Sequence, residues 1–280
     1  MTAAHNSPVL PRKLKVLLAE DNLVNRVLAQ KLLEKHGHAV VLANNGREAI
    51  ALWETNPPAH FDAILMDIQM PLMDGLQATA HIRAREESAS AAPPDVPIHI
   101  PIIAMTAHAM KGDRERYLAA GMDGYVSKPV VPADLEKVLQ SVVAQVSRRG
   151  FPAAPEPSSN LDGPPPSGVE ETQILARFDG DRELVRELAE LFILECPKHL
   201  NQMRAALRDN NAKNLAHSAH TLKGSAGNFS SKGIYETAQE LELLAREGKL
   251  DGVPELLKTL EDQLAHFNQI LAGMIAQTVR

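Results

Sequence analysis

The sequence predicts an α/β domain with a doubly wound, five-stranded parallel sheet, followed by an all-α helix-bundle domain. Two observations carry this expectation. Short apolar runs alternate with helical patterns up to about residue 146, and only helical patterns follow residue 168. Between them, 147–168 holds six of the nineteen prolines and no periodic apolar pattern, which is typical of a flexible linker. We therefore expect domains at 12–146 and 169–280, a division that fits the 280-residue length.

Five short apolar runs in the first domain are the expected strands. They alternate little between apolar and polar residues, so we expect every strand to be buried on both faces. Helical patterns lie between them, and β-α units in series give a parallel, doubly wound sheet. A long, proline-rich, exposed loop is expected over 84–100. The strands are expected at Lys15–Ala19, Ala39–Ala43, Ala63–Met66, Pro101–Met105 and Gly124–Ser127.

The second domain shows no strand pattern, and polar or glycine-containing turns separate its helical segments. This arrangement is typical of an antiparallel four-helix bundle. The helices are expected at about Val169–Phe178, Asp181–Arg208, Ala212–Phe229, Gly233–Glu247 and Val253–Thr278.

Composition excludes several classes of protein. A single cysteine, Cys196, leaves no intramolecular disulfide and no multi-cysteine zinc site, so we expect a reduced, cytoplasmic setting. No run of about 18 apolar residues is present, so no membrane segment is expected. The net charge of −6 and the 4% aromatic content argue against a nucleic-acid partner.

Chemically complementary residues stand at four predicted strand ends. Glu20 and Asp21 end the first strand and Asp67 ends the third, while Thr106 and Lys128 end the fourth and fifth. Ligands bind at this edge of an open α/β sheet. If the first and third strands are neighbours, three carboxylates converge there and suit Mg²⁺. A carboxylate can also attack a phosphoryl group whose charge the metal, ammonium and hydroxyl share. Each residue alone would more often be a solvated loop residue or a helix cap, so the combination carries the prediction.

The segments LLAEDNLVNR, ILMDIQMPLMDG, IIAMTAHA and GYVSKPV resemble the response-regulator receiver domain, over about 14–146. The resemblance implies a flavodoxin-like fold in which Asp67 accepts a phosphoryl group. It implies that Glu20, Asp21 and Asp67 bind Mg²⁺ together with the backbone carbonyl of Gln69.

The same resemblance assigns the other strand-end residues. Lys128 would contact the phosphoryl group, Thr106 would be the switch hydroxyl and Tyr125 the rotating aromatic. It also makes the Lys128–Pro129 bond a candidate for the cis form.

A helical pattern over Asn214–Phe229 contains two histidines outside its apolar stripe. At about 100° per residue, His220 lies roughly 140° from the centre of that stripe and is expected to point to solvent, as is His217. The helical wheel alone does not show which of the two histidines is the functional one. Gly224 and Gly227 cost about 1 kcal/mol each relative to alanine in a helix. They indicate helix-end fraying, a close helix crossing or the close approach of a partner beside His220.

The motif AHTLKGSAGNF resembles the histidine phosphotransfer (HPt) domain, over about 168–278. The resemblance places the phosphorylated residue at His220. It implies that Lys223 stabilises the phosphoryl group and that Gly224 leaves room for a docking receiver.

Together these resemblances imply a two-component phosphorelay protein that accepts a phosphoryl group on Asp67 and carries one on His220. Its expected partners are a sensor histidine kinase as donor and the receiver domain of a response regulator that docks at the HPt helix. No kinase domain is recognisable, so whether the chain is an enzyme in its own right stays open. The alternatives are a fragment of a hybrid sensor histidine kinase, a Mg²⁺-dependent aspartyl-phosphate phosphohydrolase, and a pure adaptor. Gln69 argues against the phosphohydrolase, which would place a second aspartate there.

Overall fold

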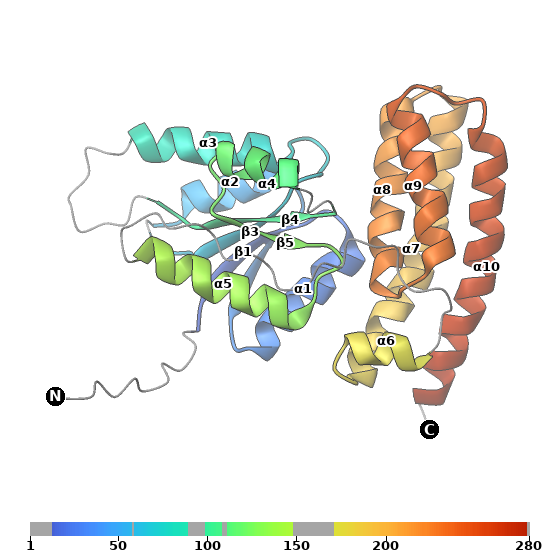
Figure 1. The fold of residues 1–280 in the computed structure, drawn as a ribbon, viewed down its shortest axis with the longest axis horizontal. Coiled ribbons are helices and arrows are strands. Elements are labelled where there is room, and N and C mark those ends of the chain that lie inside the picture. Colours follow the sequence, from blue (N-terminus) through green and yellow to red (C-terminus); the bar gives the residue numbers. More distant parts are fainter. Residues whose placement is uncertain (1–12, 58, 89–98, 108–110, 148–170, 279–280) are drawn as a thin grey trace.

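A computed structural model of the chain shows an α/β domain beside an upright helix bundle (Figure 1). Both predicted fold classes are confirmed. The predicted linker lies outside the described residues except for Ser147, which ends the last helix of the α/β domain. The structure describes residues 13–57, 59–88, 99–107, 111–147 and 171–278.

The sheet of the α/β domain is parallel throughout, with strand order β2-β1-β3-β4-β5. Strands β1 and β3 are neighbours, as the convergence of the carboxylates requires, and Leu18 pairs with Leu65 between them. The strands run β1 Lys15–Ala19, β2 Ala39–Ala43, β3 Ala63–Asp67, β4 Ile102–Thr106 and β5 Gly124–Ser127.

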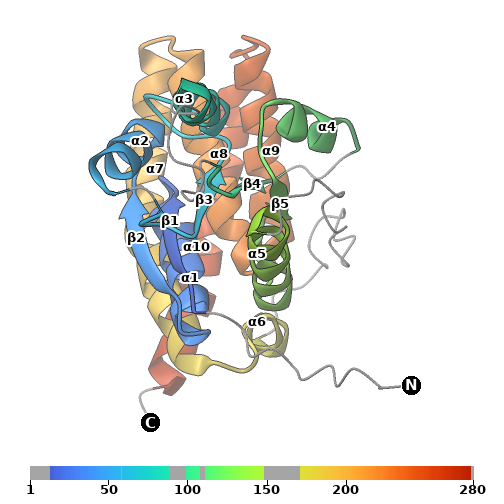
Figure 2. The same ribbon diagram turned by 90° about the vertical axis from the view of Figure 1, so that its left-hand side faces the viewer.

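Helices cover both faces of the sheet (Figures 1 and 2). Helices α1 and α5 cover one face, where Leu28 and Leu139 pack in the core, and α2, α3 and α4 cover the other, where Ile82 packs. These helices span α1 Leu23–Lys35, α2 Gly46–Thr55, α3 Gly75–Ser88, α4 Lys111–Ala119 and α5 Pro132–Ser147.

Two local predictions for this domain were wrong. Strand β2 is not buried on both faces, because it is the edge strand, and Leu42 is 37% exposed. The expected loop over 84–100 begins later than predicted, since α3 continues to Ser88. Its residues 84–87 are alanine, arginine and glutamate, which favour a helix. Residues 89–98 of that expected loop lie outside the described residues.

The second domain is a bundle of four long helices with a short helix at one end. Phe192, Phe229 and Phe267 meet edge to face in its core, with ring centroids 5.3 to 6.1 Å apart. None of the described helices is both long enough and apolar enough to cross a membrane. The helices span α6 Glu171–Arg177, α7 Arg182–Arg208, α8 Ala212–Asn228, α9 Lys232–Arg246 and α10 Val253–Thr278.

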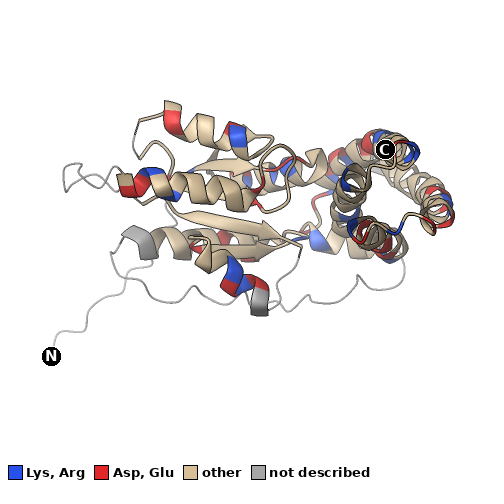
Figure 3. Ribbon diagram, turned by 90° about the horizontal axis from the view of Figure 1, so that it is seen from above, with Lys and Arg blue, Asp and Glu red and all other residues tan. Residues whose placement is uncertain are grey.

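The two domains are in contact, and the sheet is oriented toward the bundle. Seen from above, the strand arrows point at the helix bundle, so the carboxyl ends of the strands face it (Figure 3). Helix α1 contacts α7 and α8. Flanking this contact, Lys31 pairs with Glu187 at 3.2 Å and Lys35 with Asp181 at 3.5 Å.

Candidate functional site

The predicted acidic residues converge at the carboxyl edge of the sheet. Carboxylate oxygens of Glu20, Asp21 and Asp67 lie within 4.8 Å of one another, and we call these three residues the acidic pocket. Glu20 and Asp67 are buried, being 1% and 3% exposed. The ammonium of Lys128 lies 2.6 Å from Glu20 Oε2 and 2.8 Å from Asp67 Oδ2. The topology therefore brings one cation and three carboxylates into a single cluster, in which Asp21 is the only partly exposed carboxylate.

The electrostatics of the acidic pocket fit a divalent cation. Burial, and then the charge of Asp67, raise the pKa of Glu20 to about 8 and that of Asp21 to about 7. Burial acts to lower the pKa of Lys128, but Asp67 and Glu20 outweigh it and raise that pKa. Glu20 Oε2 lies against the Lys128 ammonium, and no other partner of that oxygen is found among the described residues. Hard oxygen ligands with unsatisfied negative charge suit Mg²⁺.

The backbone beside the pocket is also positioned by Asp67. The N–H of Gln69 donates to Asp67 Oδ1 at 3.3 Å, which fixes the turn after β3. The Lys128–Pro129 bond is cis, as the resemblance implied.

The predicted switch residues are both buried, but the contact seen at Thr106 involves a tyrosine that the sequence did not single out. Thr106 Oγ1 lies 2.8 Å from the hydroxyl of Tyr117, which comes from α4. Tyr125 lies on β5, where it is paired in register with Ala104. The signal for Tyr117 was available, since it is an aromatic residue in a short polar helix.

Helix α8 holds His220 at a buried position, so the expectation of solvent exposure was wrong. The apolar stripe itself is buried as predicted, and His220 lies outside it but is only 9% exposed. Contacts from other elements, which a helical wheel does not contain, surround this part of α8. Glu242 of α9 contacts the ring, and Asn22 of the α/β domain lies against Thr221. His217 is more exposed, with 37% of its side chain accessible.

Glu242 is a second residue of the site that the sequence did not single out. Its Oε1 lies 3.1 Å from His220 Nδ1, and its Oε2 accepts a 2.6 Å hydrogen bond from Lys223. Arg246 also donates to Oε1, at 2.6 Å. Burial acts to raise the pKa of Glu242, but the hydrogen bond and charge of His220, and those of Lys223, hold it well below its usual range. A glutamate within the buried face of α9, one turn after Ala238, was the available signal.

Buried side-chain amides join the domains beside His220. Asn22 caps α1 through its Oδ1, and its Nδ2 donates to the carbonyl of Thr221 at 2.7 Å and to Ser225 Oγ at 2.9 Å. Asn228 Nδ2 donates to Asn25 Oδ1 at 2.8 Å. All of these side chains are buried, so the contact excludes water and satisfies its polar groups internally.

Gly224 lies within this contact. A Cβ placed on it would be 3.1 Å from Asn25 Nδ2, whereas one on Gly227 would meet nothing closer than 3.6 Å. The close approach of α1 to α8 therefore depends on the missing side chain of Gly224.

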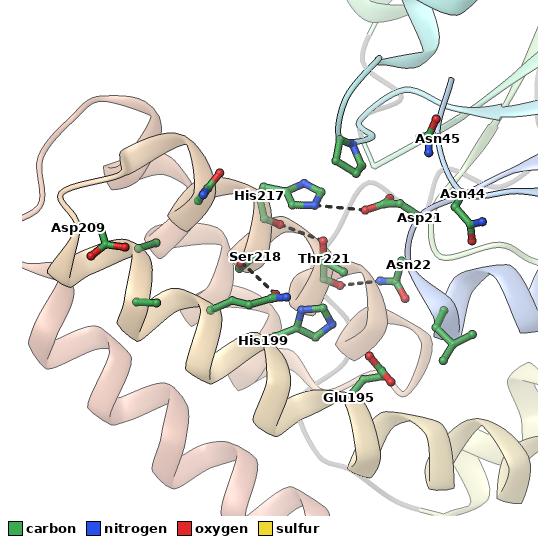
Figure 4. Close-up of a pocket in the computed structure, with 16 residues that line it drawn as sticks. Asp21, Asn22, Asn44, Asn45, Glu195, His199, Asp209, His217, Ser218 and Thr221 are labelled. Atoms are coloured by element: carbon green, nitrogen blue, oxygen red, sulfur yellow. Dashed lines mark hydrogen bonds and ion pairs between the residues drawn. The ribbon is translucent and has the colours of Figure 1, made fainter. Parts of the chain in front are cut away.

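A cleft of about 560 Å³ lies between the domains next to the acidic pocket. His217 reaches across it, and its Nε2 lies 3.4 Å from Asp21 Oδ2 (Figure 4). His199 and Thr221 also line it. Burial, and then the charge of His220, lower the pKa of His217.

The acidic pocket lies at the carboxyl edge of a parallel sheet, and that edge faces a helix whose histidine is bound to a carboxylate. This combination is typical of proteins that transfer phosphoryl groups. Residues 16–140 match the response regulator receiver domain family, and residues 187–270 match the Hpt domain family. The chain belongs to these families: it is a receiver domain followed by an Hpt domain, the pairing of a two-component phosphorelay protein.

Two curated relatives align with most of the chain. The sensor histidine kinase GacS of Pseudomonas protegens is 30% identical over 239 residues, which cover 83% of this chain and 24% of GacS. The aerobic respiration control sensor protein ArcB of Escherichia coli O157:H7 is 27% identical over 271 residues, covering 95% of this chain and 32% of ArcB. The chain thus spans about a third or less of the length of these relatives.

Two solved structures are each similar to about half of the chain. The receiver domain of a sensor histidine kinase from Pseudomonas aeruginosa PAO1, with a magnesium ion in its active-site cleft, is 37% identical with a TM-score of 0.40. That match covers 48% of this chain and all of the other. The complex of Saccharomyces cerevisiae Ypd1 with the receiver domain of Ssk1 gives 32% identity and a TM-score of 0.43, covering 49% of this chain and 92% of that chain.

Proposed function

We propose that the chain is a phosphorelay module in which Asp67 accepts a phosphoryl group and His220 of the same chain receives it. The observation that supports transfer within one chain is the buried amide contact of Asn22 and Asn25 with α8, because it seats the carboxyl edge of the sheet on the helix that carries His220. The expected donor is a sensor histidine kinase. The expected further acceptor is the receiver domain of a response regulator, which would dock on α8 in place of the receiver of this chain.

We propose that Glu20, Asp21, Asp67 and the backbone carbonyl of Gln69 hold Mg²⁺. Bound there, Mg²⁺ would supply positive charge that shields the phosphoryl oxygens. Lys128, which lies between Glu20 and Asp67, is placed to contact the same oxygens once the carboxylates are shared with the metal. A carboxylate oxygen of Asp67 is the nucleophile toward the donor.

In the transfer step a nitrogen lone pair of His220 attacks phosphorus. The N–P bond forms while the bond between phosphorus and the Asp67 oxygen breaks, and the electron pair of that bond stays on the Asp67 carboxylate. The ionised carboxylate of Glu242 only accepts hydrogen bonds, so Nδ1 of His220 carries the proton and the lone pair lies on Nε2. Lys223 is the nearest cation to His220 along α8, and it is bound to Glu242 in the resting structure.

Transfer is tested with a radiolabelled acyl phosphate as donor, using the whole chain. Phosphohistidine is base-stable and acid-labile, whereas the acyl phosphate on Asp67 is base-labile. We expect base-stable label on the wild-type chain, appearing at a rate independent of protein concentration, and none on Asp67→Ala or His220→Gln. A mixture of those two variants reports transfer between chains, which must rise with concentration. Base-stable label on His220→Gln would assign the acceptor to another histidine, His217 first.

We also propose that the chain acts as part of a larger hybrid sensor kinase or beside one, since relatives that it matches over most of its length are sensor kinases of three or more times that length. A cytoplasmic setting is proposed because the sole cysteine, Cys196, is a buried free thiol.

Steady release of phosphate from many small phosphoesters would favour the phosphohydrolase alternative over the phosphorelay.

A further inference from the structure

The hydroxyl groups of Thr106 and Tyr117 form a buried contact that links the acidic pocket to α4. Their oxygens are 2.8 Å apart, and the two residues are 3% and 4% exposed. Thr106 follows Met105, which pairs with Asp67 across the sheet, so Thr106 stands at the edge of the pocket. Tyr117 comes from the helix next in sequence. Burial raises the pKa of Tyr117, which keeps its phenol protonated at neutral pH.

Tyr117 is also the attachment point of α4. Of the α4 residues whose side chains are described, 113–119, Tyr117 alone is buried. Its ring packs in the core cluster that contains Tyr125 and Met122. A displacement of Tyr117 therefore moves α4 as a whole, because no second buried side chain of that stretch holds the helix in place.

We propose that Tyr117 is a positioning residue that holds Thr106 in the resting receiver and couples the occupancy of Asp67 to the position of α4. The inference rests on the proposed function, in which Asp67 is phosphorylated. A phenol is more acidic than an aliphatic alcohol, so Tyr117 is the better donor and Thr106 the better acceptor. When Thr106 moves toward a phosphoryl oxygen on Asp67, the buried phenol loses this partner unless α4 follows.

The strength of this hydrogen bond sets how strongly the occupancy of Asp67 is coupled to the position of α4. A buried neutral hydrogen bond is worth a factor of about 2 to 12 in an equilibrium constant. The contact between Thr106 and Tyr117 should therefore weaken binding of a phosphoryl mimic at Asp67 by that factor. Tyr117→Phe removes the hydroxyl but keeps the ring that anchors α4, so it separates the two roles of the residue.

The test is the affinity of the whole chain for beryllofluoride, a phosphoryl mimic, in the presence of Mg²⁺. The variants are Tyr117→Phe, Thr106→Ala and the double variant, with Tyr235→Phe as the matched control in the Hpt domain. We expect Tyr117→Phe to tighten binding about 2- to 12-fold and to have no effect in the Thr106→Ala background. Tyr235→Phe should match the wild type. The methyl NMR signals of Leu118 in α4 should shift on binding in the wild type.

Three results would overturn the inference: an unchanged affinity in Tyr117→Phe, a weaker one, or an equal change with and without Thr106. Thermal unfolding of each variant shows whether the fold is retained. Should Tyr117→Phe fail to fold, Thr106→Val tests the same bond from its other end and should release Leu118 in the resting state. Unshifted Leu118 signals in Thr106→Val would then contradict the inference. If the wild-type chain does not bind beryllofluoride, or Asp67→Asn binds it equally well, the proposed function fails instead.

Discussion

His220 and Glu242 are joined by a 3.1 Å hydrogen bond between Nδ1 and Oε1, across helices α8 and α9. Glu242 is held ionised, so it can only accept, and this fixes the tautomer of the imidazole. The same carboxylate binds Lys223. One buried side chain on α9 thus orients both functional residues that the sequence motif placed on α8.

The first prediction concerns this orientation. Glu242→Gln removes the charge that selects the Nδ1–H tautomer of His220. Carboxylates that orient metal-binding histidines contribute roughly 10–100-fold, and by analogy we expect base-stable labelling of His220 to slow by about that factor. Quench-flow labelling measures the rate, and imidazole ¹⁵N shifts report the tautomer.

Arg246→Gln is the matched control for Glu242→Gln. It removes a cation from the same carboxylate without touching His220, and Arg246 is 50% exposed. A rate within about twofold of the wild type is expected, because exposed ion pairs contribute little. Equal losses in both variants would show that general destabilisation of α9, not orientation of His220, is responsible.

The second prediction concerns the two glycines of α8. Gly224→Gln crowds Asn25 and should slow transfer within the chain about tenfold or more, since overpacking costs about 1–3 kcal/mol. A Cβ at position 227 would make only ordinary van der Waals contacts, so Gly227→Ala should transfer the phosphoryl group at the wild-type rate. The measurement is again the concentration-independent appearance of base-stable label. Equal rates in Gly224→Gln and the wild type would show that transfer does not use this docked arrangement.

The placement of functional residues at the carboxyl edge of the sheet could be predicted, because it depends only on which residue follows each strand in the sequence. A buried apolar run followed by an acid, a threonine or a lysine places that residue at the carboxyl edge wherever the strand sits in a parallel sheet. Glu20, Asp67 and Lys128 therefore lie at that edge, and they converge there because β1 and β3 are neighbours. The exposure of Leu42 depends instead on which strand forms the edge, and periodicity does not encode strand order.

The partners of the functional residues could not be predicted in the same way. A helical wheel gives the direction of His220 on its own helix but not what lies opposite, and here Glu242 of α9 lies opposite. Tyr117 illustrates the same limit, since its contact with Thr106 joins a helix face to a strand end. These contacts are set by tertiary packing between elements, which single-sequence patterns do not contain.

The third prediction is Mg²⁺ binding by the acidic pocket. Titration with Mg²⁺ should change the fluorescence of Trp53 or shift NMR signals of the pocket, and Asp21→Ala should weaken binding roughly a hundredfold. A pair of opposite charges near a protein surface is worth a few kcal/mol, which sets that magnitude. Glu87→Gln, an exposed change on α3, should bind as the wild type does. Identical titrations of Asp21→Ala and the wild type would exclude Asp21 as a ligand.

The fourth prediction concerns pH and rests on a polar cluster away from the pocket. His99 Nε2 lies 2.7 Å from Asp123 Oδ1, and its Nδ1 lies 3.4 Å from Glu86 Oε2. These hydrogen bonds, to Asp123 and then to Glu86, raise the pKa of His99 from 6.5 to about 9. A folded-state pKa above the unfolded value means that the protonated ring stabilises the fold. That contribution is complete below pH 6.5 and is lost as the pH rises through about 9.

We therefore expect the receiver domain to lose stability toward alkaline pH through His99. Urea unfolding followed by Trp53 fluorescence measures the free energy of unfolding of the wild type and of His99→Gln from pH 6 to pH 9.5. The difference between them should shrink by about 1 kcal/mol over this range, a value reduced for solvent screening because the His99 side chain is 35% exposed. Saturating Mg²⁺ keeps the acidic pocket, whose carboxyls also titrate near neutral pH, the same in both proteins. A difference that stays constant with pH would show that His99 is neutral in the folded protein and that its contacts with Asp123 and Glu86 act only as uncharged hydrogen bonds.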